Sequence, residues 1–387
     1  METPYFLLKE ELLSQNIAGF QGALREIWPN SILAYSVKTN SLPWILRWMD
    51  AHGVYAEVVS DEEYDLAMLS GYTEDHLVFN GPIKGLKKIR SALHQGGIVN
   101  IDSEKELLYL SAEKPTCRGV LGIRVNVNPA LFSEKDVGYQ EDGFRFGFSE
   151  ENGELARALD SLEEAYQTRS FGLHLHVNSV TRSVDVYRAI ARFAAALVQK
   201  YRLTPSFVDI GGGFFGGVPG KATPKEYLEA IKSELVPVVD PLITKLILEP
   251  GSAAVGSCFE LHTTVLDVKD TARARIVTTD GSRIHIDPLW IKKRYLYTLE
   301  TEGKRCPRQV ICGYTCMDHD RLMILEDEPE LSPGDHIVYA RVGNYTVTFG
   351  GPFIRYLPPV YVQIGVQTRL IRRRMDVEDY YRLEFVE

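Results

Sequence analysis

A buried strand meets the start of a helix in the stretch ILAYSVKTNSLP, residues 32–43. Ile32–Val37 is apolar and rich in residues that favour strands. Ser41 and Pro43 mark a helix start, because serine can cap a helix and proline is preorganised for its first turn. The stretch therefore predicts one βα unit, with Lys38 at the end of its strand.

The same alternation of short apolar runs and amphipathic stretches continues to about residue 255. The predicted strands are Ile32–Val37, Tyr55–Val59, Leu77–Phe79, Ile98–Ile101, Leu121–Val127, Phe171–Val177, Phe207–Ile210 and Leu246–Leu248. The predicted helices are Pro43–His52, Glu62–Ser70, Lys84–His94, Ser103–Ser111, Val184–Lys200 and Pro224–Leu235. These strands lack a polar face, as is usual for parallel strands buried on both sides. The pattern favours a (β/α)8 TIM barrel over residues 20–255, with a doubly wound sheet as the alternative.

After residue 256 short strands follow one another with turns between them, such as Asp280-Gly281 and Ser332–Asp335. The predicted strands are Leu261–Leu266, Arg275–Thr279, Gln309–Gly313, His336–Ala340, Tyr345–Phe349 and Val360–Arg369. We therefore expect an α/β plus all-β protein. Its second domain is a C-terminal, mostly antiparallel β-domain, formed by residues 256–387 together with residues 1–19.

Composition narrows the class of protein. The chain has 387 residues, 45% hydrophobic and 25% charged, with a formal net charge of −9. This is typical of a soluble globular protein and argues against a nucleic-acid partner. The five cysteines fit no disulfide framework. Neither a signal peptide nor an apolar run long enough to cross a bilayer is visible, so we expect a cytoplasmic protein with no membrane partner.

Lys38 stands where the catalytic residues of a barrel collect, at the carboxyl end of a strand. A lysine desolvated at such a position can lose its proton near neutral pH and attack an aldehyde. Taken alone, the position is more typical of an ordinary surface lysine. His174 and His176 share one face of a later strand. No third ligand follows at a usual spacing, so we expect no metal there. The common interpretation of such a histidine is a structural role in the core. The more specific interpretation places His176 against a planar cofactor ring.

A glycine triplet follows the strand Phe207–Ile210 and consists of Gly211, Gly212 and Gly213. With Gly216 it formally satisfies the dinucleotide-binding pattern, but Val218–Gly220 breaks the chain where the required helix would begin. A P-loop also fails, because its first glycine position holds Phe215. What remains is a run of open backbone N–H groups that can hold one phosphate.

Two further candidates are Glu249 and Cys316. Glu249 ends a strand, where a carboxylate can hydrogen-bond the protonated nitrogen of a pyridine cofactor and increase its capacity to accept electrons. An ordinary salt-bridged glutamate is the alternative. Cys316 lies in a polar loop, where a thiol can donate a proton. Its spacing from Cys312 and His319 suggests a metal, but a fourth ligand is missing.

The order of these signals resembles that of the fold-type III pyridoxal-phosphate decarboxylases, the ornithine and diaminopimelate decarboxylase family with the alanine-racemase-like fold. The resemblance runs from about Thr3 to Tyr381. Its main motifs are the strand ending in Lys38, His176, the glycine triplet, Glu249, Cys316 and Gly343–Thr346. Lesser matches are Glu57–Ser60 followed by Glu63, Asp102-Ser103, Arg124, Phe146-Gly147 and Thr368–Arg374.

The resemblance implies pyridoxal 5'-phosphate as the cofactor, held as a Schiff base on Lys38. His176 would stack on the pyridine ring and Glu249 would pair with its nitrogen. The other cofactor-binding residues would be Ser179, Gly211, Gly212, Gly213, Tyr345, Glu57 and Arg124. Cys316 would return a proton to the substrate after CO2 leaves, reaching across a homodimer with shared active sites.

Four departures from the family pattern concern the ligands. Asn178 replaces the glycine of His-Val-Gly-Ser, Ser252 replaces the arginine of Glu-Pro-Gly-Arg, Met317 replaces an acid, and Asp287-Pro288 replaces Arg-Pro. Losing these arginines and this acid weakens recognition of a distal carboxylate or amine. We therefore expect the substrate to be an amino acid, or an amino-acid group on a larger conjugate, in specialised biosynthesis. Met317, Asp318 and Asp287 would lie near it.

Three alternatives remain for the function. The first is a diaminopimelate or basic amino-acid decarboxylase of primary metabolism. The second is a pyridoxal-phosphate-dependent racemase, which needs a second base opposite the lysine. The third is a regulatory relative without activity, which would be expected to have lost Lys38 or Cys316, yet both are present.

Overall fold

The computed structural model describes residues 1–114, 118–139, 141–292 and 294–383. The chain forms two compact units. The barrel unit is Asn16–Ala254, and the β unit combines Met1–Gln15 with Val255–Glu387. Helix α1 (Glu10–Ile27) contains the first boundary between them.

Eight parallel strands close into a barrel in the first unit. They are β2 (Ser31–Ser36), β3 (Tyr55–Val58), β4 (Leu77–Phe79), β5 (Ile98–Ile101), β6 (Val120–Asn126), β8 (Gly172–His174), β9 (Phe207–Asp209) and β10 (Lys245–Leu248). Each pairs in parallel with the next in this order. The barrel closes because β10 also pairs with β2, placing Ile247 beside Ile32. Closure confirms the predicted (β/α)8 barrel and excludes the doubly wound sheet. The short strand β7 (Phe148–Ser149) extends the sheet beside β6.

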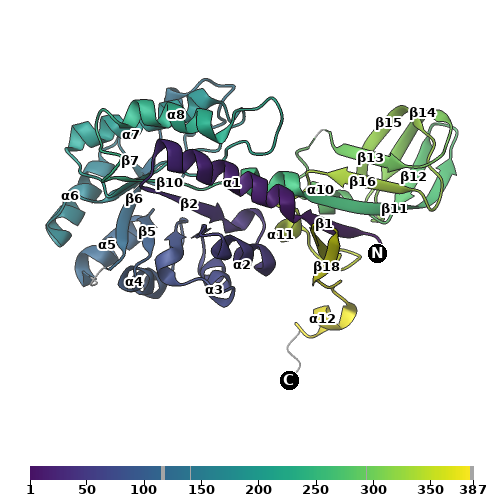
Figure 1. The fold of residues 1–387 in the computed structure, drawn as a ribbon, viewed down its shortest axis with the longest axis horizontal. Helices are drawn as coiled ribbons and strands as arrows, with labels where there is room; N and C mark the ends of the chain where they lie inside the picture. The colour runs from purple at the N-terminus through teal and green to yellow at the C-terminus, as the bar shows by residue number, and fades with distance from the viewer. Residues whose placement is uncertain (115–117, 140, 293, 384–387) are drawn as a thin grey trace. The chain divides into compact units, whose positions relative to one another are not determined.

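Helices alternate with these strands along the chain and surround the barrel (Figure 1). They are α2 (Pro43–Ala51), α3 (Asp61–Leu69), α4 (Leu86–Gln95), α5 (Glu104–Glu113), α6 (Glu154–Tyr166), α7 (Val184–Tyr201), α8 (Pro224–Leu235) and α9 (Ser252–Val255). Several begin at a side-chain cap, for example α3 at Ser60 and α8 at Thr223, whose hydroxyls accept backbone N–H groups of the first turn. Within the described ranges, every helix is too short or too polar to span a bilayer.

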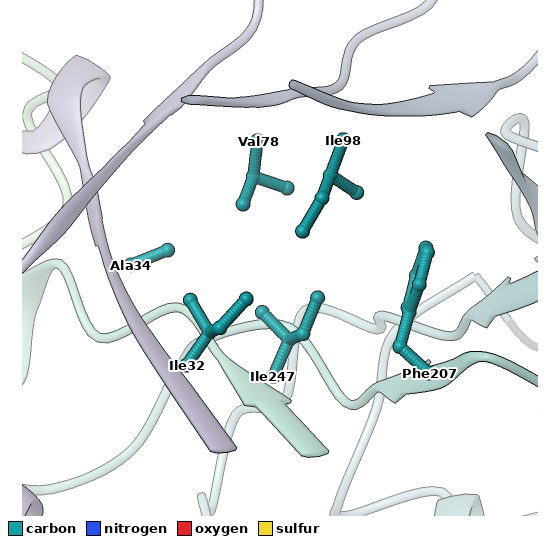
Figure 2. Packing of buried hydrophobic residues seen from close by; sticks show 6 residues of the cluster. All are labelled: Ile32, Ala34, Val78, Ile98, Phe207 and Ile247. Carbon is teal, nitrogen blue, oxygen red and sulfur yellow. The ribbon is translucent and has the colours of Figure 1, made fainter. Parts of the chain in front are cut away.

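The barrel interior is filled by apolar side chains from five strands. Figure 2 shows six of them pointing toward one another: Ile32, Ala34, Val78, Ile98, Phe207 and Ile247. None is more than 7% exposed. Phe207 fits because glycines face it, since a Cβ at Gly172 would lie 2.1 Å from its ring and one at Gly122 would lie 2.5 Å away. This packing makes the barrel a rigid support for the residues at its rim.

The β unit is a mixed sheet. Its strands are β1 (Tyr5–Lys9), β11 (Phe259–Asp270), β12 (Arg275–Thr279), β13 (Leu296–Glu300), β14 (Arg305–Cys312), β15 (Arg321–Pro329), β16 (His336–Ala340), β17 (Val360–Ile364) and β18 (Gln367–Arg372). Its short helices are α10 (Arg283–Ile286), α11 (Thr346–Phe349) and α12 (Val377–Tyr381). Most pairings are antiparallel, as expected, but β1 with β17 and β12 with β14 are parallel.

The predicted strand Tyr345–Phe349 is wrong, because Thr346–Phe349 forms a short helix instead. Tyr345 has a φ of +58°, in the left-handed region, which an extended strand does not contain. The Thr346 hydroxyl also donates to the carbonyl of Val342, which fixes the turn. The predicted strand Val360–Arg369 is correct only in part, since a turn at Gly365 divides it into β17 and β18.

Candidate active site

The carboxyl ends of the barrel strands place the candidate side chains on one rim. Lys38 follows β2, Glu57 lies near the end of β3, His176 follows β8 and Glu249 follows β10. Asp209 is the last residue of β9, directly before the segment that carries the glycine triplet. Five strands therefore bring together residues that are far apart in the sequence.

Lys38 forms an ion pair with Glu57, and its Nζ lies 2.8 Å from Glu57 Oε2. Ser36 donates its hydroxyl to the same oxygen at 2.6 Å. Burial acts to raise the pKa of Glu57, but the charge of Lys38 and hydrogen bonds from Lys38, Ser36 and Asn80 outweigh it, so the pKa is lowered. Glu57 therefore remains a carboxylate and holds the amine of Lys38 at the rim.

Asn80 links the two carboxylates of the site. Its Nδ2 donates to Glu57 Oε1 at 3.1 Å and to Glu249 Oε1 at 2.6 Å. Its Oδ1 accepts a hydrogen bond from Asn100 at 2.8 Å. Asn80 is only 2% exposed. Sequence reasoning missed Asn80. Its position directly after the apolar strand β4, where catalytic residues of a barrel collect, could have indicated a place in the site.

Glu249 lies in a buried group with Asp209 and His174. One oxygen or nitrogen atom from each of the three lies within 4.8 Å of the others. Burial, followed by the charges of Asp209 and Glu57, raises the pKa of Glu249 well above its ordinary value. Burial also raises the pKa of Asp209, to about 7. For His174, burial and then the charge of Arg124 lower the pKa, so the ring is neutral. At neutral pH the two carboxyl groups therefore carry less than two full negative charges.

The donor atoms of His174, Asp209 and Glu249 are of types that bind divalent cations. The expectation of a metal-free protein therefore stays a prediction. Among the described residues, no other group of three such side chains lies as close together. The Cys312, Cys316 and His319 spacing accordingly does not form a metal cluster.

His176 packs against the glycine triplet. The N–H of Gly212 donates to His176 Nδ1 at 3.3 Å. A Cβ at Gly211 would lie 2.6 Å from the same nitrogen, and the φ of Gly211 is +70°, so both space and backbone require glycine. Burial, then the charges of Arg124 and Lys38, lower the pKa of His176 to about 3. The imidazole is therefore neutral and offers a flat, uncharged face.

Two further barrel residues are held by the loops of the rim. Ser179 Oγ donates to the carbonyl of Asp136 at 3.1 Å and accepts from the N–H of Arg182 at 2.8 Å. Arg124, on β6, donates to Asp102 Oδ2 at 3.2 Å and contributes positive charge to the site. Their roles in binding the cofactor stay predictions.

In the β unit, the loop between β14 and β15 carries three candidates, which are Cys316, Met317 and Asp318. Cys316 and Asp318 are exposed, and Met317 is half-buried. Asp320, which is buried, holds this loop in place by accepting hydrogen bonds from the hydroxyls of Ser282 at 2.9 Å and Thr315 at 2.7 Å. Sequence reasoning missed Asp320, because two of its partners, the Ser282 hydroxyl and the Arg283 N–H at the start of α10, lie 38 and 37 residues away.

Asp287 is held by its own loop. Its side chain is 1% exposed. Its oxygens accept hydrogen bonds from Arg283 at 2.8 Å and from the N–H of Ile291 at 3.0 Å. The carboxylate therefore stabilises this loop, and its predicted place near the substrate stays a prediction. Tyr345 caps α11 with its ring near Phe349, and its role in phosphate binding stays a prediction.

The chain matches the family model described as pyridoxal-dependent decarboxylase, pyridoxal binding domain, over residues 15–256. It therefore belongs to the pyridoxal-dependent decarboxylase family, and it is a fold-type III enzyme of that family. Diaminopimelate decarboxylase of Archaeoglobus fulgidus is 28% identical over 358 residues, covering 89% of this chain and 83% of that protein. Diaminopimelate decarboxylase of Helicobacter pylori J99 is 27% identical over 402 residues, covering 99% and 96%.

Solved structures share the fold. Diaminopimelate decarboxylase from M. jannaschii has a TM-score of 0.86 at 22% identity, over 100% of this chain and 93% of that one. The Helicobacter pylori enzyme complexed with L-lysine has a TM-score of 0.82 at 24% identity, over 99% and 97%. Arginine decarboxylase of Paramecium bursaria Chlorella virus has a TM-score of 0.76 at 20% identity, over 94% and 96%. At these identities the likeness concerns the fold.

The cofactor of the family is pyridoxal 5'-phosphate, and the rim residues fit it. Lys38 supplies an amine. His176 supplies a flat neutral ring, and Gly211 has no Cβ that would collide with it. Glu249 supplies a buried carboxyl group for a ring nitrogen. Of the glycine triplet, Gly213 can offer its backbone N–H to a phosphate, because the N–H groups of Gly211 and Gly212 donate to Asp209 Oδ1 at 2.8 Å and to His176 Nδ1 at 3.3 Å. The protein is accordingly a pyridoxal-phosphate-dependent carboxy-lyase that acts on an amino acid.

Proposed function

We propose that this protein decarboxylates a free diamino acid, with diaminopimelate as the first candidate. The supporting observation is the end-to-end match to diaminopimelate decarboxylases, which covers 89% of this chain in one relative and 99% in another. The sequence had favoured an amino-acid group on a larger conjugate in specialised biosynthesis. The comparisons give that interpretation no support and favour the primary-metabolism alternative.

Bound as a Schiff base, the cofactor would draw electrons from the Cα of the substrate, which is the chemistry that lets CO2 leave. The protein's own task is to prepare and position the reacting groups. Glu57 lies 2.8 Å from the amine of Lys38 and, as a carboxylate, holds that amine in position at the rim. Asn80 fixes the spacing of Glu57 and Glu249, because it donates to both.

The proton that replaces the carboxylate would come from Cys316. Its thiol is exposed on a loop that Asp320 holds in place. Thiols are competent proton donors when positioned at the reacting carbon. We propose that this donation occurs across a homodimer with shared active sites, in the cytoplasm.

The choice of diamino acid would depend on the loop that carries Asp318. Asp318 is exposed next to Met317 and can pair with a distal ammonium group. Diaminopimelate, lysine and ornithine all carry a distal amine, so lysine and ornithine belong beside diaminopimelate in the test.

The test is CO2 release by the protein loaded with cofactor, measured on diaminopimelate, ornithine, lysine, arginine and aminocarboxypropyl conjugates. Lys38→Ala should abolish release, whereas Lys245→Ala, an exposed lysine at the first residue of β10, should leave it unchanged. Release from a free diamino acid supports the proposal. Release from conjugates alone would contradict it, as would inversion of the substrate's configuration without release of CO2, which would indicate a racemase.

A further inference from the structure

Two cations flank the aromatic ring that follows the glycine triplet. Arg182 Cζ lies 5.5 Å from the centre of the Phe215 ring, and Lys221 Nζ lies 5.2 Å from it. Neither cation has an ion-pair partner in the part of the chain that the structure describes. Within the described ranges, the Phe215 ring after the glycine triplet therefore lies next to two positive charges that form no ion pair with an acidic side chain.

The backbone of Arg182 is tied to this part of the rim on both sides. Its N–H donates to Ser179 Oγ at 2.8 Å, and its carbonyl accepts from the Tyr227 hydroxyl at 2.7 Å. The same hydroxyl accepts from the N–H of Phe215 at 3.4 Å. Arg182 has a φ of +52°, a left-handed conformation that is unfavourable for a residue with a side chain. Such conformations persist where surrounding contacts impose them, and here the contacts fix where the side chain leaves the loop.

The charge of Arg182 acts on a tyrosine that contacts the glycine triplet. The hydroxyl of Tyr187 donates to the carbonyl of Gly212 at 3.2 Å. Burial raises the pKa of Tyr187, and the nearby positive charge of Arg182 opposes that rise. The guanidinium therefore lies near enough to Tyr187, a hydrogen-bond partner of Gly212, for its charge to act on that hydroxyl.

Ser252 borders the same turn but cannot supply a charge. A Cβ at Gly216 would lie 2.3 Å from the carbonyl of Ala253, so the turn packs directly on the residue after Ser252. The N–H groups of Gly211 and Gly212 donate to Asp209 and His176, and the N–H of Gly213 can hydrogen-bond a phosphate without neutralising it. An anion bound there would therefore lack a cationic partner unless a side chain from another loop provides one.

We propose that Arg182 binds the phosphate of the cofactor and supplies the positive charge that Ser252 does not, with Lys221 adding a second, outer charge. A guanidinium matches this task, because it forms charge-assisted and often paired hydrogen bonds with phosphate oxygens. The inference depends on the cofactor and not on which amino acid is decarboxylated. Its failure would therefore leave the proposed substrate untouched.

The experiment compares two ligands on the cofactor-free, full-length protein. Pyridoxal 5'-phosphate and pyridoxal, which lacks the phosphate, are titrated separately, and binding is followed by absorbance and by quenching of intrinsic fluorescence. Arg182→Gln should weaken binding of the phosphate ester by about tenfold or more, since a charge-assisted contact is lost. Binding of pyridoxal should stay within about twofold, because it makes no such contact. Lys221→Gln should weaken only the ester, by about two- to threefold.

Two control variants distinguish charge from structure. Arg188→Gln removes a guanidinium from helix α7 away from Phe215 and should leave both affinities unchanged. Arg182→Lys keeps the charge and should bind the ester more tightly than Arg182→Gln does. The proposal is overturned if Arg182→Gln leaves the ester's affinity intact, if ester and pyridoxal weaken equally, or if lysine at this position binds no better than glutamine.

Discussion

Replacing Asn80 with alanine should loosen the link between the two carboxylates of the site and destabilise the barrel. The change removes hydrogen bonds to Glu57 at 3.1 Å and Glu249 at 2.6 Å, and it takes away the acceptor of Asn100 at 2.8 Å. All four side chains are at most 5% exposed. The hydrogen bond to the charged Glu57 contributes about 1.5–3 kcal/mol, the one to Glu249, whose pKa is raised, contributes about 0.5–1.5 kcal/mol, and buried atoms left without partners add a further cost. Partial relaxation of the site offsets some of these losses. In total, the free energy of unfolding should fall by about 3–5 kcal/mol.

The assay is urea unfolding of the cofactor-free protein, followed by circular dichroism. Asn30→Ala is the matched control, because the Asn30 amide also makes two hydrogen bonds, to the carbonyls of Leu242 at 3.2 Å and Ile243 at 3.0 Å, but at an exposed position. This control should lose less than about 1 kcal/mol. Equal losses in the two variants would refute the reasoning, because buried hydrogen bonds to carboxylates would then be worth no more than exposed ones to carbonyls.

Three further predictions concern pH, subunit sharing and metals. The pKa of Asp209 is raised by burial from 3.8 to about 7, so between these values the folded protein keeps a proton that the unfolded chain has lost, and stability falls as pH rises through this window. Asp209→Asn lacks this decline, so its stability relative to the natural protein should increase from pH 4 to pH 8 by up to about 4 kcal/mol, and a difference that is constant with pH would contradict the assignment. The variants Lys38→Ala and Cys316→Ala should each be inactive alone. If each site takes one residue from each subunit, mixing the two variants so that mixed dimers form should restore about a quarter of the natural activity. No recovery would mean that both residues of a site come from one chain. Dialysis against a chelator should change neither activity nor cofactor content, whereas release of a stoichiometric metal ion would assign one to His174 and its neighbours.

Features of the fold that depend on local pattern could be predicted from the sequence. The barrel strands are continuous apolar runs, and helices such as α3 and α8 begin at capping residues, so both kinds of element were found close to their observed positions. Helix α6 was missed because it begins after Gly153, which has a φ of +80° and no capping side chain. The helix Thr346–Phe349 was mistaken for a strand because its β-branched and aromatic residues favour strands.

The candidate site was predictable where a reactive side chain ends an apolar strand, as Lys38 and Glu249 do. Asn80 could not be assigned a role in the same way. Its two partners lie 23 and 169 residues away, so its function exists only after the barrel has closed. Asp287 shows a second limit, because its hydrogen bonds to Arg283 and to the N–H of Ile291 could not be inferred from the family pattern.

The place of β1 in the sheet has a consequence for how the chain matures. β1 lies between β11 and β17, with Leu7 opposite Glu260 on one side and Tyr361 on the other. The barrel unit ends at Ala254, so during synthesis on the ribosome all its strands emerge before either partner of β1 does. Domains tend to fold as units once they are complete, and an unpaired strand is prone to aggregate. The barrel can therefore fold first, while β1 stays unpaired until β11 emerges and gains its second neighbour only with β17.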